Sequence, residues 1–476
     1  MAAVVPPGCC FPTESHPMKG SREGTASAVP KSSGHSGVLT PEVRRWVAGS
    51  SNEIAASNRH SRTPLSYLLR SAGLLLACMA LLPNSAAAQD AITPQTPYAT
   101  LDRNGVAYRG PGRENSANLQ GATVNIGVLL PLRGANAAEG QPLLEAANMA
   151  LAEEEAAGPL ADGRHLTLSV RNQAEQWGQA TSEMVRLISE ERVAALITSS
   201  DGNIAHQAEQ IANKIGIPIV TLASDATTTQ INIPWIFRLG PSDEDQAHAI
   251  ASQIYQSSLS KKVLLLVETD HDGRVGGDEF EKAVKHLHGT PPERLDVPSS
   301  GVDLETIAAR AQASAPDAIV LWTGAPLAAR LLALLSANNF ARPNYVCRKA
   351  AASVAGNAFD LANSGTPVPT ALPQGTWVTA SAAGATRIDL LAFQERYRSL
   401  TGFWPSFAAM QAYDAVHLVA QALRMAGANR SRLRDYLAAG HPFAGISGTI
   451  VFDPAGNTLG DTHLIRIASV DSSPAL

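Results

Sequence analysis

From residue 124 onward, short apolar runs alternate with amphipathic segments, and this alternation constrains the fold more than any other feature of the chain. The first apolar run is 124–130, and the Ala- and Glu-rich segment 140–157 follows it with apolar residues at helical spacing. Strands that alternate with helices in this way are typical of βαβ units and a parallel sheet. The apolar runs also lack polar alternation, as expected where helices cover both faces of a sheet. The sequence therefore predicts an α/β protein.

The same pattern predicts the individual elements and groups them into two lobes, at about 124–241 and 242–349. The predicted strands are 124–130, 165–170, 193–197, 218–222, 263–267 and 318–322. The predicted helices are 140–157, 179–191, 203–215, 247–256, 278–288, 304–313, 326–337, 390–400, 406–426 and 431–438. A β-hairpin is expected at the C-terminal end, formed by 448–452 and 463–467 around the turn residues 453–457.

The N-terminal part of the chain has the pattern of a leader. Residues 1–62 are rich in Gly, Ser, Pro and Thr and show no period, which predicts disorder or an extension upstream of a misplaced start site. Residues 63–88 join a basic start, a short apolar run and a small-residue end, so we expect an export signal peptide cleaved after Ala88. Residues 89–122 are polar and turn-rich, which predicts a linker or an N-terminal arm.

The apolar run of the leader has two other interpretations. It is far shorter than the roughly 20 residues that a membrane span requires, but a short buried helix would have the same pattern. A lipoprotein anchor through Cys78 is the second, because 75–78 loosely resembles a lipobox. Cleavage after Ala88 would leave Cys347 as the single cysteine, so an exported protein would have no internal disulfide.

Motifs and charge exclude several functional classes. The net charge of −5 argues against a nucleic-acid-binding chain, which would show a basic face. The sequence contains no GxGxxG, no GxxxxGK[ST], no HExxH and no GxSxG, and no Cys/His set has zinc spacing. The acidic triplet 243–245 is expected to begin a helix capped by Ser242 rather than to bind a metal. His206 and His248 are expected to be isolated histidines on helix surfaces. The sequence thus predicts no enzyme, no metal and no cofactor.

Three strand ends in the first lobe run into loops of small or hydroxyl-bearing residues, at 131–134, 198–202 and 223–227. Ligands bind at the carboxyl ends of strands in open parallel sheets, and backbone N–H groups at helix N-termini suit a carboxylate. Ordinary helix caps would use the same residue types, so this alternative stays open. The candidate ligand-binding residues in these loops are Ser199, Ser200, Asp201, Gly202, Ala223, Ser224, Asp225 and Thr227.

A set of short strings, each weak alone, occurs in an order and spacing that resemble a known family. The strings are 124–131, 216–220, 235–239, 241–243, 393–397, Gly402, 405–406, 412–416, 445–448 and 452–453. The sequence resembles the type I periplasmic solute-binding proteins, the branched-chain amino acid (leucine/isoleucine/valine) group of ABC importers, over nearly all of 124–467. Strings 235–238 and 241–243 are also similar to the ligand-binding domains of receptor-type members.

The resemblance implies two Rossmann-like lobes with parallel sheets, joined by three hinge strands and closing on a ligand. Lobe one would comprise 124–241 plus 381–447, and lobe two 242–380 plus 448–476. The implied function is that of an exported, periplasmic substrate-binding protein with no catalysis. It would trap a small polar solute (an amino acid, an amide or a related carboxylate) and deliver it to the membrane permease of an ABC importer, as a monomer without nucleic acid.

The family's pocket residues map onto this sequence with departures. The position that offers a serine hydroxyl to the ligand carboxylate aligns best with Gly202, just after Ser199 and Ser200. The Ala and Thr of the next loop fall near Ala223 and Asp225, or on Thr227 under a two-residue slip.

Two pocket positions of the second lobe depart further. The aromatic position falls on Asp272, and the acidic residue that pairs with an amino-acid ammonium falls on Lys349. A cation at Lys349 would repel an ammonium and favour an anion, whereas Asp225 and Asp272 could supply the negative side. A solvated surface lysine is the alternative for Lys349.

The sequence leaves two alternatives to a transport function. A receptor-like sensor domain of the same fold would signal rather than deliver, and an exported enzyme on an α/β scaffold is the least supported because no nucleophile–base set is present. The absence of a kinase or DNA-binding extension favours the diffusible binding protein. A neighbouring permease gene would support transport, and a neighbouring histidine kinase gene would support sensing.

Overall fold

A computed structural model describes residues 118–134, 136–173, 178–230, 233–301, 303–353, 375–381 and 387–467. The predicted leader at 1–62 and 63–88 lies outside these residues, as does the predicted arm up to residue 117. All described residues belong to one unit of the chain, which begins at Ala88.

The first sheet has five parallel strands in the order β2-β1-β3-β4-β5. Because the chain starts in the middle of the sheet and winds toward both edges, this is a doubly wound α/β sheet. The strands are β1 (Thr123–Leu130), β2 (His165–Asn172), β3 (Leu196–Thr198), β4 (Ile219–Thr221) and β5 (Ile236–Arg238).

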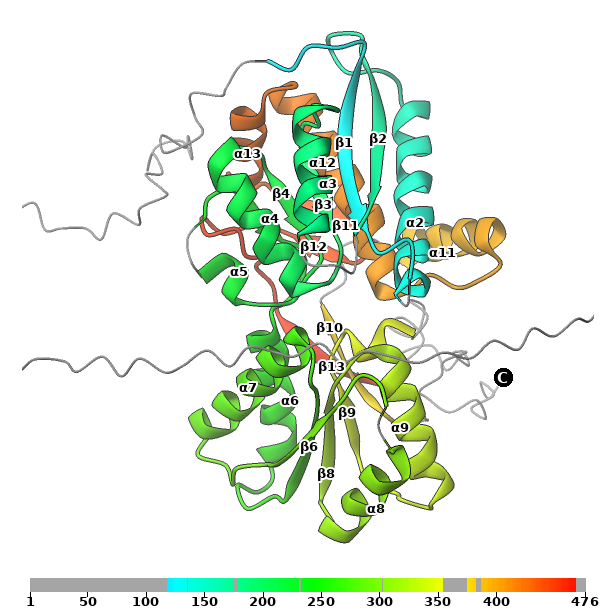
Figure 1. The fold of residues 1–476 in the computed structure, drawn as a ribbon, viewed down its shortest axis with the longest axis vertical. Coiled ribbons are helices and arrows are strands. Elements are labelled where there is room, and N and C mark those ends of the chain that lie inside the picture. Colours follow the sequence, from blue (N-terminus) through cyan, green and yellow to red (C-terminus); the bar gives the residue numbers. More distant parts are fainter. Residues whose placement is uncertain are drawn as a thin grey trace, which may run out of the picture. The chain divides into compact units, whose positions relative to one another are not determined.

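Helices cover both faces of this sheet, as the apolar strands predicted. β1 points Ile126 and Val128 into one hydrophobic core and Leu129 into the other, because successive side chains of a strand face opposite sides. The core around Ile126 contains α2 (Ala137–Ala156), α11 (Arg387–Thr401), α12 (Phe407–Ala426) and α13 (Arg430–Ala438). The core around Leu129 contains α3 (Gln179–Ser189) and α4 (Gly202–Ile215), and the short α5 (Thr227–Gln230) precedes β5. We call this layered unit lobe 1 (Figure 1).

The second sheet has six strands in the order β13-β10-β9-β8-β6-β7, and only the β13–β10 pair is antiparallel. Its strands are β6 (Val263–Glu268), β7 (Glu293–Val297), β8 (Ala318–Trp322), β9 (Asn344–Val346), β10 (Trp377–Ser381) and β13 (Thr462–Arg466). Its helices are α6 (Asp243–Tyr255), α7 (His271–His286), α8 (Leu304–Ser314), α9 (Ala325–Ala337) and the 3-10 turn η2 (Ala350–Ser353). We call this unit lobe 2; Figure 1 shows α6 and α7 on one side of its sheet and α8 and α9 on the other. The predicted fold class, two parallel α/β lobes, is confirmed.

The predicted C-terminal hairpin is wrong. β12 (Gly448–Ile450) pairs with β11 (Phe443–Gly445), and β13 pairs with β10 of the second sheet. The turn at 453–457 does form, since Asp453 Oδ1 accepts hydrogen bonds from the backbone N–H groups of two residues that follow it. The strands beyond it diverge because Ile450 and Phe452 pack into the core of lobe 1. The predicted start of lobe two at 448 is therefore too early, and within the described residues β13 is the strand of this tail that joins lobe 2.

The start of α7 lies earlier in the chain than the sequence predicted, at His271 instead of Asp278. The sequence pattern did not predict the first turns of this helix because they contain three glycines, and glycine has a low helix propensity. The packing requires all three: a Cβ at Gly273 would lie 2.2 Å from the backbone oxygen of Glu268, one at Gly276 would lie 1.6 Å from Trp322 Nε1, and one at Gly277 would lie 2.7 Å from a methyl of Val267. The helix therefore sits directly on its sheet, which places His271 and Asp272 at the edge facing lobe 1. Among the described residues, no helix combines the length and apolarity required to cross a membrane.

Candidate functional site

The predicted pocket residues of the two lobes meet at the N-terminus of α4. The backbone N–H of Gly202, the first residue of α4, donates a hydrogen bond of 2.9 Å to Oδ1 of Asp272 on α7. A carboxylate is favourable at this place because a helix N-terminus carries unpaired N–H groups and positive potential. A Cβ at position 202 would lie 2.6 Å from that oxygen, so the contact requires glycine where the family pattern has serine. The lobes are thus in direct contact at the predicted site.

The β3 loop is organised by hydrogen bonds within lobe 1. Ser199 Oγ donates to Oε1 of Gln173 at 2.5 Å, and Gln173 Nε2 donates to Oδ2 of Asp201 at 3.0 Å. The other oxygen of Asp201 accepts from the backbone N–H groups of residues 203 and 204, which makes Asp201 the cap of α4. Ser200 lies half-buried between them. The predicted loop is therefore also a helix cap, and Gln173, the residue after β2, is a member that sequence reasoning missed.

Lys349 pairs with Asp272 of α7 and with Asp270, the residue that caps α7, and is not a solvated surface lysine. Its Nζ lies 2.6 Å from Oδ2 of Asp272 and 3.0 Å from Oδ2 of Asp270. Burial lowers the pKa of Lys349, but the two carboxylates outweigh burial and hold that pKa well above its usual value. Because two carboxylates already compensate the lysine charge, the geometry does not support the expectation that Lys349 favours an anionic solute.

Asp225 is the most strongly bonded residue of the β4 loop. Its Oδ1 accepts from the backbone N–H of Thr227 at 2.8 Å and from Thr227 Oγ1 at 2.6 Å. Its Oδ2 lies 3.0 Å from Nε2 of His206 on α4 and 2.8 Å from Nε2 of His271 on α7. Burial raises the pKa of Asp225, but the hydrogen bonds from the histidines and Thr227 outweigh it, so that pKa lies well below its usual value.

His206 is thus not an isolated surface histidine. Its second ring nitrogen, Nδ1, lies 3.0 Å from Oε1 of Glu209. Hydrogen bonding to Asp225 and then to Glu209 raises the pKa of His206 to about 10, and hydrogen bonding to Asp225 raises that of His271. Sequence reasoning missed both histidines as site residues. One signal was available for His206, which follows Gly202 by one helical turn and therefore shares its face.

Another residue of the β4 loop makes a side-chain contact with the start of α6. Ala223 is buried, and its backbone N–H donates to Oγ1 of Thr221 at 3.2 Å. Ser224 Oγ donates to Oδ1 of Asp243 at 2.8 Å, and burial raises the pKa of Asp243 to about 7. The predicted Ser242 cap of α6 is confirmed by a capping box in which the Ser242 and Asp245 side chains bond reciprocally to backbone N–H groups. Ser224 therefore contacts the start of α6, where the chain leaves lobe 1, whereas the hydrogen bond of Ala223 stays within the β4 loop.

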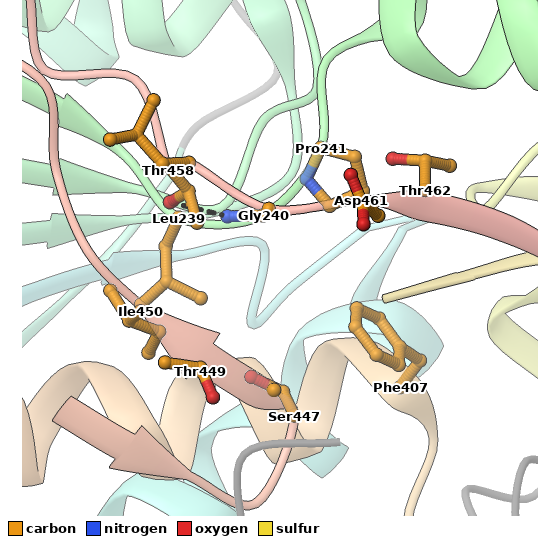
Figure 2. Close-up of a pocket in the computed structure, with 13 residues that line it drawn as sticks. Leu239, Gly240, Pro241, Phe407, Ser447, Thr449, Ile450, Thr458, Asp461 and Thr462 are labelled. Atoms are coloured by element: carbon orange, nitrogen blue, oxygen red, sulfur yellow. Dashed lines mark hydrogen bonds between the residues drawn. The ribbon is translucent and has the colours of Figure 1, made fainter. Parts of the chain in front are cut away.

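A cavity of about 170 Å³ lies where the chain passes between the lobes. Two connecting segments contribute to its lining, 239–241 from the β5–α6 connection and 458–462 from the β12–β13 connection. Figure 2 shows them side by side, joined by a 3.1 Å hydrogen bond from the Gly240 N–H to Thr458 Oγ1. The connection at 382–386 lies outside the described residues, so the structure describes two of the three hinge segments that the resemblance implies.

The two-lobed α/β fold is that of periplasmic binding proteins, and the family comparison agrees. Residues 123–474 match the family model described as periplasmic binding protein. The chain belongs to this family.

Solved structures with the same fold include transport proteins with different ligands. A protein from Rhodospirillum rubrum, assigned to branched-chain amino acid ABC transport, is 26% identical with a TM-score of 0.54, over 73% of this chain and 99% of that one. LivJ from Streptococcus pneumoniae in complex with isoleucine is 20% identical with a TM-score of 0.59, over 73% and 96%. A solute-binding protein from Rhodopseudomonas palustris in complex with 3,4-dihydroxybenzoic acid is 20% identical with a TM-score of 0.62, over 74% and 94%.

One curated protein is similar over a short stretch. Glutamate receptor 3.4 from Arabidopsis thaliana is 30% identical over 90 residues, which are 19% of this chain. The chain spans about 9% of the length of that receptor. The family and fold are therefore those of substrate-binding proteins of ABC transporters, with a short additional likeness to a receptor.

Proposed function

We propose that this protein is the exported substrate-binding component of an ABC importer. It traps a small polar solute that bears a carboxylate or amide group between its two lobes, and it passes that solute to a membrane permease. Residues 1–88 serve as the leader, and the working protein acts in the periplasm as a monomer, without a catalytic step.

One observation carries the choice of solute class. The Gly202 N–H at the N-terminus of α4 holds the carboxylate of Asp272 from the opposite lobe. This position therefore accepts a carboxylate that approaches from lobe 2. A solute carboxylate or amide oxygen that replaces Asp272 there would satisfy the same donor. Asp272, still paired with Lys349, would then be available to the polar or cationic part of the solute.

A thermal-shift screen of the purified protein tests the proposal. Amino acids, short amides, urea-like compounds and carboxylates, including aromatic ones, are added singly, and a binding solute raises the melting temperature because it binds the folded state. Ser200→Ala, in the half-buried β3 loop, should reduce or abolish the shift. Ser336→Ala, at an exposed position of α9, is the matched control. If no compound of these classes shifts the melting temperature, the assigned solute class is wrong.

A receptor-like sensor of the same fold is the second candidate, which the short match to glutamate receptor 3.4 favours. The two functions differ in the partner of the solute-bound form. Reconstituted permease with this protein should transport the solute found in the screen. If binding occurs but transport does not, and a neighbouring histidine kinase responds to the solute-bound protein, sensing is correct.

A further inference from the structure

One cluster of side chains has the composition of a metal site and lies between the lobes. The ligand atoms of His206, Asp225 and His271 all lie within 4.8 Å of one another. We propose that these three residues bind a divalent cation of the zinc class. The sequence predicted no metal site, because the three residues are far apart in the chain and have no motif spacing. The inference goes beyond the proposed function, since it depends on the cluster and not on transport.

The distances within the cluster are close to those of a coordination sphere. Zinc lies about 2.0–2.2 Å from histidine nitrogen and carboxylate oxygen, so neighbouring ligands of a tetrahedral site are roughly 3.3 Å apart. In the structure, Nε2 of His206 and Nε2 of His271 lie 3.0 and 2.8 Å from Oδ2 of Asp225. A separation greater by a few tenths of an ångström would admit the ion, and two histidines with one carboxylate are a ligand set typical of zinc.

Neighbouring residues hold two of the three ligands in the orientation that metal binding needs. Nδ1 of His206 lies 3.0 Å from Oε1 of Glu209, and a carboxylate on the far ring nitrogen fixes the orientation of a metal-binding histidine. Thr227 binds Oδ1 of Asp225 through its N–H and its hydroxyl, which leaves Oδ2 directed at the histidines. A divalent cation bound by two neutral imidazoles would take the place of the protons that the histidines hold toward Asp225, and these protons would be released to solvent.

The proposed site would couple metal binding to closure. His206 and Asp225 belong to lobe 1, and His271 is the first residue of α7 in lobe 2. An ion held by all three residues would therefore link the lobes. Three protein ligands leave one tetrahedral position open, which water or an oxygen of a solute would fill.

Metal titration of the full-length protein tests the inference. Zn²⁺ is titrated calorimetrically, and Co²⁺ is titrated with visible absorption as the readout of a tetrahedral site. We expect one equivalent to bind, and we expect His206→Ala and His271→Ala each to weaken binding at least tenfold. Glu209→Gln should weaken it by roughly 10- to 100-fold, as the loss of an orienting carboxylate does. His248→Ala, an exposed histidine of α6, is the matched control and should bind like the wild type.

Two results would overturn the inference. The first is the absence of stoichiometric Zn²⁺ or Co²⁺ binding by the wild type, which would make the cluster an ion-pair cluster only. The second is equal binding by the wild type, His206→Ala and His271→Ala, which would place the ion elsewhere in the chain. Circular dichroism checks that each variant is folded, and His271→Gln replaces His271→Ala if the latter is not. The solute screen is run with and without chelator: a solute shift without metal binding refutes the metal site alone, and metal binding without any solute shift refutes the solute assignment alone.

Discussion

Gly202→Ala is the substitution that most directly tests whether the Gly202 N–H binds the solute. The added Cβ would lie 2.6 Å from Asp272 Oδ1, 2.9 Å from His271 Cδ2 and 3.1 Å from His271 Nε2. All three atoms belong to lobe 2, and glycine 202 does not have a positive φ. The substitution should therefore leave lobe 1 folded, and it removes up to about 1 kcal/mol of the helix cost of glycine.

The magnitude follows from the contact that the methyl group disrupts. The Gly202 N–H holds the Asp272 carboxylate, and in the proposed bound state it holds a solute carboxylate or amide oxygen instead; a hydrogen bond to a charged acceptor contributes about 1.5–3 kcal/mol. An added Cβ would lie 2.6 Å from the place of the accepting oxygen, so the solute would lose this bond, which corresponds to a roughly 10- to 100-fold weaker affinity, since about 1.4 kcal/mol is tenfold. Isothermal titration with the solute found in the screen measures the affinity, and urea unfolding measures stability.

A matched glycine controls for the effect of an added methyl group. A Cβ at Gly324, the cap of α9, would lie 3.4 Å from Glu268 Oε2, which is an ordinary van der Waals distance within lobe 2. Gly324→Ala should therefore bind solute like the wild type. If Gly202→Ala binds as tightly as Gly324→Ala, the Gly202 N–H does not bind the solute and the reasoning fails.

Three further predictions concern stability and reactivity. Burial raises the pKa of Asp414 to about 6 from 3.8, so the folded chain binds the carboxyl proton of Asp414 more tightly than the unfolded chain does. The resulting stabilisation of the fold is complete below about pH 4 and is lost as the pH rises through 6. Asp414→Asn should flatten that fall in urea unfolding measured across pH, and an unchanged profile would contradict the assignment. Glu154 is buried between His417 and Arg424, so Glu154→Ala should lower the free energy of unfolding in urea by about 3–5 kcal/mol. Glu395→Ala, at an exposed position of α11, is the control and should lower it little. Equal losses in the two variants would refute the role of the buried ion pair. Burial raises the pKa of the Cys347 thiol to about 12, so Cys347 should react with a thiol reagent only after unfolding. Mass spectrometry of the Cys347 peptide measures the labelling, and rapid labelling in the native protein would contradict the prediction.

Asp414 also explains why two of the strings that carry the family resemblance occur together. Its carboxylate accepts from the backbone N–H groups of Ile446 and Ser447 at 2.8 and 2.6 Å and from Ser447 Oγ at 2.5 Å. A Cβ at Gly445 would lie 2.5 Å from the same carboxylate. The strings 412–416 and 445–448 are thus two halves of one contact. Both strings can be recognised in the sequence, but only the fold shows that Asp414 of the first string binds the backbone of the second.

The sequence by itself determined the fold class and most of its elements. Hydrophobic period and helix caps are local properties, so the apolar runs of β1 and β6 and the Ser242 cap of α6 were predictable from neighbouring residues. The prediction failed where distant segments decide the outcome. The tail at 448–467 divides between two sheets because Ile450 packs in lobe 1 while β13 pairs with β10. The start of α7 was hidden because its glycines are required by Trp322 and Val267 of the sheet beneath it.

The candidate site divides in the same way. The loops at the ends of β3 and β4 were predictable, because strand ends in a parallel sheet share one edge. Only the tertiary structure decided how their residues are used. It places Asp272 on the Gly202 N–H, compensates Lys349 with two aspartates and brings His206 and His271 to one oxygen of Asp225. Two of these contacts, Gly202 with Asp272 and Asp225 with His271, join the lobes, whereas Lys349 meets its aspartates within lobe 2 and His206 meets Asp225 within lobe 1. The physical reason is the same for all of them: the partners are far apart in the sequence, and a charge or ring nitrogen acquires its partner only when the chain is folded.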